Sequence, residues 1–257
     1  MHASAAHSVL SYEGNWLRNR LLNDRGRYLT AVLILDLHFN ESHGRGITGA
    51  RLRREVTAYD VCSRGRATAF LEALQFGGYL EVRPTANRRE RRLAPTALFT
   101  DSHIIRWNGM FAAMAHMDPE RAARAAALPA SLLFGPCAAY FAETIRKGVR
   151  AFDLAPILFD YAERDAGLVT LFSLLSHPEA DDPLSISQMA RRFSISRAHA
   201  MGLMRRAQQD GFAVPITGGY RAGPALQTAM ARFFAVVFLI FFRALEACEE
   251  ARPSQLG

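Results

Sequence analysis

The stretch SRGRATAFLEALQFGGYLEV, residues 63–82, decides the fold because a second stretch of the same chain repeats its pattern. It aligns without a gap on SRAHAMGLMRRAQQDGFAVP, residues 196–215. Both begin with Ser-Arg, both have apolar residues at the i, i+3, i+4, i+7 spacing of an amphipathic helix, and both reach a glycine before a β-rich segment. The apolar positions are Ala67, Phe70, Leu71 and Leu74 in the first stretch and Ala200, Leu203, Met204 and Ala207 in the second.

Two further blocks extend the alignment upstream in the same order. ITGARLRREV, residues 47–56, falls on LSISQMARRF, residues 184–193. RGRYLTAVLILDL, residues 25–37, falls on RDAGLVTLFSLLS, residues 164–176. The register changes only in the loops between the blocks. Three blocks in one order predict that the chain contains the same unit twice.

Each unit has the same order of predicted elements. An apolar helix comes first, and a short helix that begins after a Ser or Thr N-cap comes second. A tight turn with one buried apolar residue leads to the helix quoted above, which ends at a glycine suited to the left-handed conformation. A β-rich segment follows, and this layout is that of a winged helix-turn-helix. The apolar helices are 29–39 and 168–175, the N-caps Thr48 and Ser185, the buried turn residues Cys62 and Ile195, and the closing glycines Gly78 and Gly211.

We therefore predict a mainly α fold with small β-hairpin wings, in which tandem winged helix-turn-helix domains have a pseudo-twofold arrangement. The Ala-rich stretch 118–130 is the expected boundary. Residues 1–118 would form the N-terminal domain with its flanking helices, and residues 119–257 the C-terminal one. The apolar stretch FFAVVFLIFF, residues 233–242, is too short to span a bilayer. It predicts a buried helix, and no membrane contact is expected.

The composition favours an intracellular protein with a polyanionic partner. The 257 residues carry a net charge of +7, and the isoelectric point is about 9.8. Cys62, Cys137 and Cys248 are scattered, which indicates a reducing cytosol rather than disulfides or a zinc site. The N-terminus lacks the basic start and apolar core of a signal peptide. We expect a cytoplasmic, nucleoid-associated protein.

The sequence offers no motif for catalysis. It contains no P-loop, GxGxxG, nucleophile elbow or HExxH motif, so we expect no enzymatic activity and no cofactor. Metal-ligand residue types occur in the loop 177–182, but without the spacing of a metal site, and no metal is expected.

Basic residues cluster where a winged helix would contact DNA. The recognition helix, residues 63–77, would enter the major groove, where arginine can hold guanine through two hydrogen bonds and small residues can contact thymine methyls. Arginines on the preceding helix would contact phosphates. The predicted DNA contacts of the first repeat are Arg51, Arg53, Arg54, Ser63, Arg64, Arg66 and Thr68.

The predicted wing, residues 83–92, is the most basic segment of the chain. Its four arginines near the hairpin tip would lie along phosphates or enter the minor groove. They are Arg88, Arg89, Arg91 and Arg92. The second repeat has a short wing with Arg221 alone, so we expect it to bind DNA more weakly. Its candidate contacts are Ser196, Arg197, His199 and Arg205.

Residues 29–96 resemble the MarR family of winged-helix regulators. That family's wing reads Asp-Arg-Arg and is followed by Leu-Thr, where this chain has Asn87-Arg88-Arg89 and Pro95-Thr96. The resemblance implies groove contacts from Arg64, Arg66 and Thr68 and wing contacts from Arg88 and Arg89. Two features depart from the family. Asn87 replaces the aspartate that would orient the wing arginines, and two wings stand in one chain, whereas family members have one wing and dimerise through their terminal helices.

These patterns favour a sequence-specific regulator of transcription that binds double-stranded DNA. A plasmid-type replication initiator with tandem winged helices is the first alternative, because it would also place two winged domains in one chain. A winged-helix scaffold for protein interactions is the second, and the basic wing argues against it.

Two further partners are considered. The long helices expected at 96–117 and 224–250 either pack within the chain or form a homodimer. Trp16 and Trp107 either belong to an ordinary core, which we favour, or line a pocket for a small aromatic effector.

Overall fold

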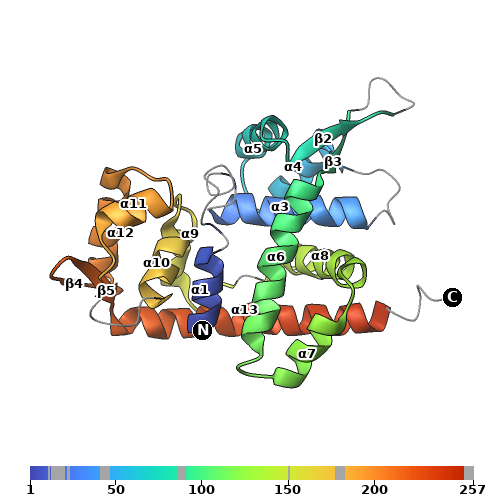
Figure 1. Ribbon diagram of the computed structural model, residues 1–257. Helices are drawn as coiled ribbons and strands as arrows, with labels where there is room; N and C mark the ends of the chain where they lie inside the picture. Colours follow the sequence, from blue (N-terminus) through green and yellow to red (C-terminus); the bar gives the residue numbers. More distant parts are fainter. Residues whose placement is uncertain are drawn as a thin grey trace. The chain divides into compact units, whose positions relative to one another are not determined.

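The chain is mainly helical, with two small antiparallel sheets (Figure 1). The computed structural model describes residues 1–10, 12, 21, 24–40, 47–85, 91–149, 151–176 and 183–251. These residues form two compact units. Unit 1 combines residues 1–25 with residues 151–238, and unit 2 combines residues 26–150 with the segment from residue 239 onward.

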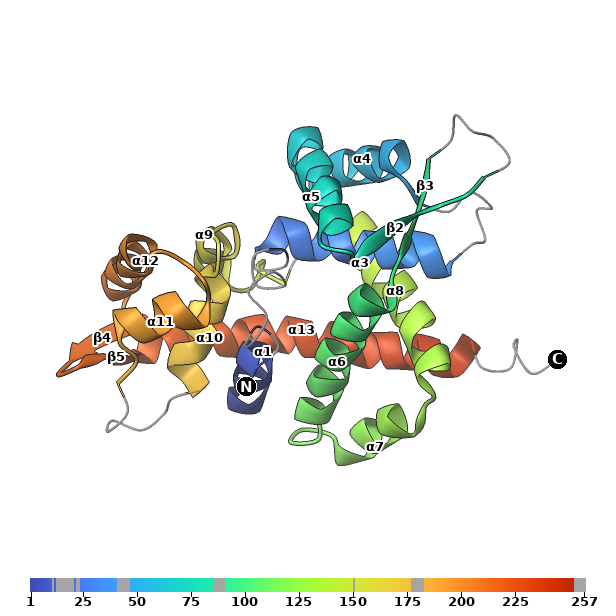
Figure 2. The same cartoon turned by 45° about the horizontal axis from the view of Figure 1, so that its top comes forward.

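Unit 2 contains most of the first repeat and the helices that follow it. Its elements are α3 (Arg25–Phe39), β1 (Ile47–Thr48), α4 (Gly49–Ala58), α5 (Arg64–Phe76), β2 (Leu80–Arg83), β3 (Arg92–Pro95), α6 (Ala97–Met114), α7 (Pro119–Ala127), α8 (Ala130–Arg146) and the C-terminal part of α13 (Pro224–Ala251). In Figures 1 and 2, α4, α5 and the β2–β3 hairpin lie on the same side of α3.

Unit 1 contains the N-terminal helix and the second repeat. Its elements are α1 (His2–Leu10), a 3₁₀ turn (Pro156–Leu158), α9 (Phe159–Ala162), α10 (Gly167–Ser176), α11 (Ile186–Arg192), α12 (Arg197–Gln209), β4 (Ala213–Ile216), β5 (Gly219–Ala222) and the N-terminal part of α13. Helix α1 packs along α10, and the His2 ring is hydrogen bonded to the Leu175 carbonyl at 2.9 Å.

The N-caps predicted for the two short helices are confirmed, and the two helices that follow them also have serine caps. The hydroxyl of Thr48 accepts a hydrogen bond from the Arg51 N–H at 3.2 Å, and Ser185 and Gln188 form a complete capping box. Ser63 and Ser196 cap α5 and α12 in the same way. All eight apolar positions predicted for α5 and α12 are buried.

The turn between the paired helices has the same geometry in both units, but the residues predicted to be buried there, Cys62 and Ile195, are only half-buried. Asp60 and Ser194 take the left-handed conformation, with φ of 52° and 54°. The next residue donates its N–H to a carbonyl five residues back, from Val61 to Val56 and from Ile195 to Ala190, as in a Schellman motif. Val61, 1% exposed, is therefore the counterpart of Ile195, and Cys62 is an additional residue before the cap.

A bridge to the second strand of the hairpin closes each repeat. In unit 2, β3 pairs with β2 and also with β1, where Ile47 stands opposite Leu93. In unit 1, β4 pairs with β5, and Leu184 forms an isolated antiparallel bridge with Tyr220. The segment before the short helix is thus joined to the hairpin in both units.

Helix α13 supplies apolar side chains to both units. Phe233 and Phe234 pack against Phe172 in unit 1, and Phe241 packs against Phe111 and Phe141 in unit 2. The predicted burial of residues 233–242 holds for Phe233, Phe234, Phe238 and Phe241 only, and Leu239 is 57% exposed. The helix is nevertheless far longer than that stretch. By length and composition alone, its residues Pro224–Glu250 could also cross a membrane.

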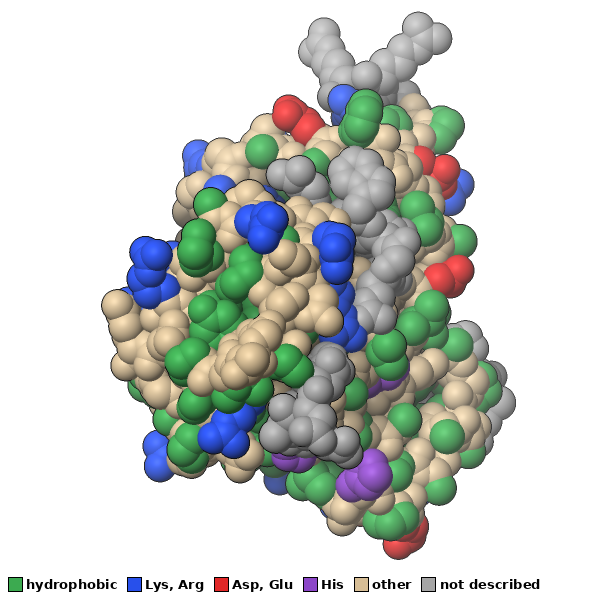
Figure 3. All heavy atoms as spheres, turned by 60° about the vertical axis from the view of Figure 1, so that its left-hand side comes forward, with side chains coloured by type: hydrophobic (Ala, Val, Ile, Leu, Met, Phe, Trp, Pro, Cys, Tyr) green, Lys and Arg blue, Asp and Glu red, His purple; other side chains and the backbone are tan. Residues whose placement is uncertain are grey.

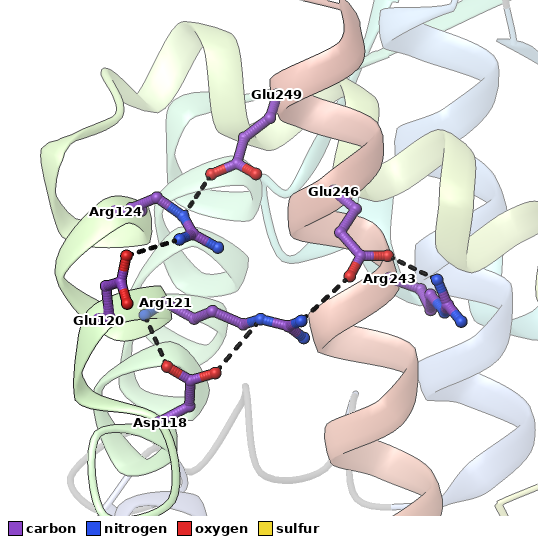
Figure 4. A network of polar contacts seen from close by, with 7 residues as sticks. All are labelled: Asp118, Glu120, Arg121, Arg124, Arg243, Glu246 and Glu249. Carbon is purple, nitrogen blue, oxygen red and sulfur yellow. Dashed lines mark hydrogen bonds and ion pairs between the residues drawn. The ribbon is translucent and has the colours of Figure 1, made fainter.

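The two units do not follow the predicted boundary between residues 118 and 119. The Ala-rich stretch expected there forms α7, which is capped by Asp118 and packs on α6. Arg121 pairs with Glu246, and Arg124 with Glu249, which attaches α7 to the C-terminal part of α13 within unit 2 (Figure 4). The contacts of α7 and α8 therefore place residues 119–149 in unit 2.

Two of the cysteines that appear scattered in the sequence meet in unit 2. The sulfur atoms of Cys137 on α8 and Cys248 on α13 are 3.5 Å apart and buried. The hydrogen bond with Cys248, together with burial, raises the pKa of the Cys137 thiol. Cys248 donates to the Leu133 carbonyl, so the pair forms a satisfied thiol chain in the core.

The glycine that closes α12 provides a test of this local geometry. Gly211 has φ of 70°, whereas Gly202 lies in the body of the same helix with open space around it. Gly211→Ala should lower the free energy of unfolding by about 1 kcal/mol, because the left-handed region is strained for alanine. Gly202→Ala, the control, should raise it by roughly 0.5–1 kcal/mol. Urea unfolding measures both, and equal effects would contradict the assigned conformations.

Candidate nucleic-acid interface

Three arginines line a surface hollow between α4 and α5. Leu52 and Val56 of α4 are buried, which leaves Arg53 and Arg54 on the outer side of that helix. Arg64 is the first residue of α5. Together with Ala50 these arginines line a hollow of about 330 Å³, which we call the arginine hollow.

The guanidinium groups of the arginine hollow have no acidic partner within the described part of the chain. Among those residues, the guanidinium groups of Arg53, Arg54 and Arg64 form no ion pair and no hydrogen bond. The nearby carboxylate of Glu55 pairs instead with Arg146 of α8. Like charges gathered without a counter-charge favour an anion, and the N-terminus of α5 adds its positive dipole at the same place.

The first turns of α5 are open to solvent. Gly65, Arg66 and Ala69 are exposed, and Thr68 is half-buried with its hydroxyl donating to the Arg64 carbonyl at 3.0 Å. The hydroxyl of Ser63 is occupied by the cap, since it accepts from the Arg66 N–H. Ser63 therefore positions α5. At the other end of the helix Phe76 is 94% exposed, which the apolar periodicity did not indicate.

The predicted wing is described at its base only. Arg83 and Arg92 stand opposite each other where the hairpin strands pair, and Arg83 also pairs with Glu81 at 2.8 Å. Arg91 donates to the Gln75 side chain at 2.9 Å, which attaches the second strand to α5. Arg88 and Arg89 lie outside the described residues, as do Asn87 and Trp16.

An ion-pair network holds α4 in place. Arg146, near the end of α8, donates to Asp36 of α3 at 2.6 Å and to Glu55 of α4 at 3.1 Å. Burial alone would lower the pKa of Arg146, but the hydrogen bond and charge of Asp36 raise it above its ordinary value. These residues belong to no motif that points to the site in the sequence. The available signal was Asp36, an acid within the apolar run of residues 29–39.

Two of the basic side chains on α12 of the C-terminal repeat have partners within unit 1. The His199 ring is hydrogen bonded to the Asp165 carbonyl at 2.8 Å, and Ser196 is the helix cap. Arg206 pairs with Asp210 at 2.9 Å and with Asp160 at 3.5 Å. Of the predicted contacts, Arg197 and Arg205 remain exposed. Figure 3 brings this side of the molecule forward and shows basic side chains dispersed among uncharged surface.

The arginine hollow has no full counterpart in the C-terminal repeat. When the N-caps Thr48 and Ser185 are aligned, Ala190 takes the position of Arg53, while Arg191 and Arg197 correspond to Arg54 and Arg64. Ala190 is also buried.

Other candidate sites are weaker. Trp107 is buried, donates to the Tyr28 hydroxyl and packs on Phe134 and Phe141, as a core residue does. In the described ranges no group of three or more His, Cys, Asp or Glu side chains could hold a metal ion, and residues 177–182 lie outside those ranges.

Comparison of the chain with protein-family models, with curated proteins and with solved structures finds no match. The resemblance of residues 29–96 to the MarR family therefore stays a prediction.

The support of α4 can be tested at two adjacent residues. Arg146→Ala should lower the free energy of unfolding by about 2–4 kcal/mol, because it leaves the nearly buried Asp36 without its cation. Lys147→Ala removes an exposed pair with Glu143 and should cost less than about 1 kcal/mol. Chemical denaturation of both variants gives the comparison, and similar losses would contradict a structural role for Arg146.

Proposed function

We propose that the protein is a sequence-specific regulator of transcription that binds double-stranded DNA through tandem winged helices. The N-terminal repeat is the principal reader, with α5 in the major groove. The observation that carries this proposal is the arginine hollow beside the exposed first turns of α5. Its three guanidinium groups have no counter-charge among the described residues, as a surface for a polyanion requires.

The order of elements supports a winged helix as the reading unit. Two helices joined by a tight turn precede a hairpin, and a bridge from β1 to β3 holds the hairpin beside the short helix. In such a unit the second helix presents its N-terminal residues to base edges. In α5 these residues include Arg66 and Ala69, which suit a guanine edge and a close approach to a thymine methyl.

The C-terminal repeat has a secondary role in this proposal. Its Arg206 is neutralised by two acids, its His199 is hydrogen bonded within the unit, and its β4–β5 hairpin carries a single arginine, Arg221. It would add non-specific affinity or hold a partner while the N-terminal repeat selects the sequence.

Capture of sheared genomic DNA by the purified full chain at physiological salt tests the proposal. We expect enrichment of one motif. Arg66→Ala should reduce the preference for that motif by about 5- to 150-fold, which corresponds to roughly 1–3 kcal/mol for the loss of one bidentate base contact. It should leave binding to unrelated duplexes nearly intact.

Arg232→Ala is the charge-matched control, because Arg232 is exposed on α13 outside both helix pairs. It should leave the motif and its preference unchanged. Uniform recovery of all sequences would refute a sequence-specific regulator, and recovery of no DNA would refute DNA binding. Enrichment of several direct repeats in one region would support a replication initiator instead.

A further inference from the structure

The structure assigns Arg64 to the DNA backbone rather than to a base: we propose that Arg53, Arg54 and Arg64 together bind one phosphodiester group in the arginine hollow. This inference rests on the proposed function and specifies which part of DNA this site takes. It also differs from the sequence prediction, which placed Arg64 with Arg66 as a reader of bases.

The grouping of the side chains is the first argument. Arg64 and Arg66 are near neighbours on α5, but Arg64 lines the hollow with two arginines of α4, and Arg66 does not. Arginine side chains that line one hollow from two helices can together surround an anion. A base edge in the major groove would need Arg64 to extend away from α4 instead.

The shape of the hollow is the second argument. Ala50 contributes only a methyl group to its lining, and the Arg53 guanidinium lies over Gly49, where an added Cβ would be 3.1 Å from Nη1. Small residues at the start of α4 therefore leave room for both the guanidinium and a ligand. Because Ala50, Arg54 and Arg64 are exposed, the hollow is accessible from the surface, as a phosphate within a continuous strand requires.

The local electrostatics are the third argument. The Glu55 carboxylate on the same helix is taken by Arg146, so it does not neutralise the hollow. The first N–H groups of α5 add positive potential beside Arg64, and helix N-termini commonly bind phosphate. Three arginines that share one phosphodiester group, which carries a single negative charge, would act as a unit, and their contributions to affinity would not add.

Methylphosphonate scanning of a bound duplex tests the inference. Each phosphate is replaced in turn by a neutral methylphosphonate, and affinity is measured by fluorescence anisotropy. For the wild type we expect one position at which neutralisation weakens binding about tenfold, the cost of a charge-assisted contact. At that position the loss should vanish in Arg64→Ala and shrink in Arg53→Ala and Arg54→Ala. The logarithmic salt dependence of Arg64→Ala should be shallower by about 0.9.

Two further variants distinguish the effect of the space in the hollow from the effect of its positive charge. Ala50→Leu fills the hollow without changing any charge and should reproduce most of the loss seen for Arg64→Ala. Ala58→Leu, at the exposed end of the same helix, should not. The inference is overturned if Arg64→Ala weakens binding only to the preferred sequence, or if Arg53 and Arg64 respond to different phosphates. Either result would leave DNA binding itself intact.

If the protein binds no duplex, the proposed function fails and the hollow is tested alone. Inorganic phosphate is then titrated against the full chain at constant ionic strength, with chloride as the reference, and the arginine Nε–Hε resonances are followed by NMR. If Arg64→Ala abolishes these shifts, the hollow is a phosphate site whose ligand is not duplex DNA. Identical responses to phosphate and chloride would overturn it.

Discussion

Each repeat is closed by a bridge between its hairpin and the segment just before its short helix. Ile47 pairs with Leu93, and Leu184 pairs with Tyr220. Because the hairpin follows α5 or α12 directly through a left-handed glycine, the bridge connects both ends of the helix pair into a closed arrangement. In unit 2 this closure sets the start of α4, and therefore Ala50 and Arg53, beside the start of α5. The gathering of positive charge in the arginine hollow follows from a backbone constraint rather than from attraction between the side chains.

The same backbone carries unequal surfaces in the two units. Positions that bear Arg53 and Arg64 in the N-terminal repeat bear Ala190 and Arg197 in the C-terminal one. Arg206 on α12 is neutralised by Asp210 and Asp160. Arg197 and Arg205 of α12 nevertheless stay exposed, so the two repeats differ in the residue at the Arg53 position and in the pairing of Arg206 rather than in their caps and turns.

Features that depend on neighbouring residues in the chain were predictable, and features that depend on distant ones were not. The four N-caps, the left-handed Gly78 and Gly211 and the buried faces of α5 and α12 involve residues within one or two helical turns. The turn after Asp60 was predicted one residue too late. Cys62 is an additional residue between the Schellman motif and the Ser63 cap, and the ungapped alignment pairs it with Ile195 in place of Val61. The inclusion of residues 119–149 in unit 2 depends on pairs such as Arg124 with Glu249, which are 125 positions apart. The arginine hollow was likewise not predictable, because the proximity of Arg64 to Arg53 depends on how α4 and α5 pack.

The units also differ in which end of the helix pair a flanking helix supports. In unit 2, Arg146 of α8 joins α3 to Glu55, so the support acts on α4, beside the arginine hollow, and removes an acid that would compete for its arginines. In unit 1 the Tyr161 hydroxyl, from α9, donates to Asp210 at the end of α12, and burial with this hydrogen bond raises the pKa of Tyr161, so the phenol stays protonated. That contact fixes the carboxylate that neutralises Arg206. One flanking helix thus draws an acid away from the exposed arginines of its unit, and the other holds an acid against Arg206.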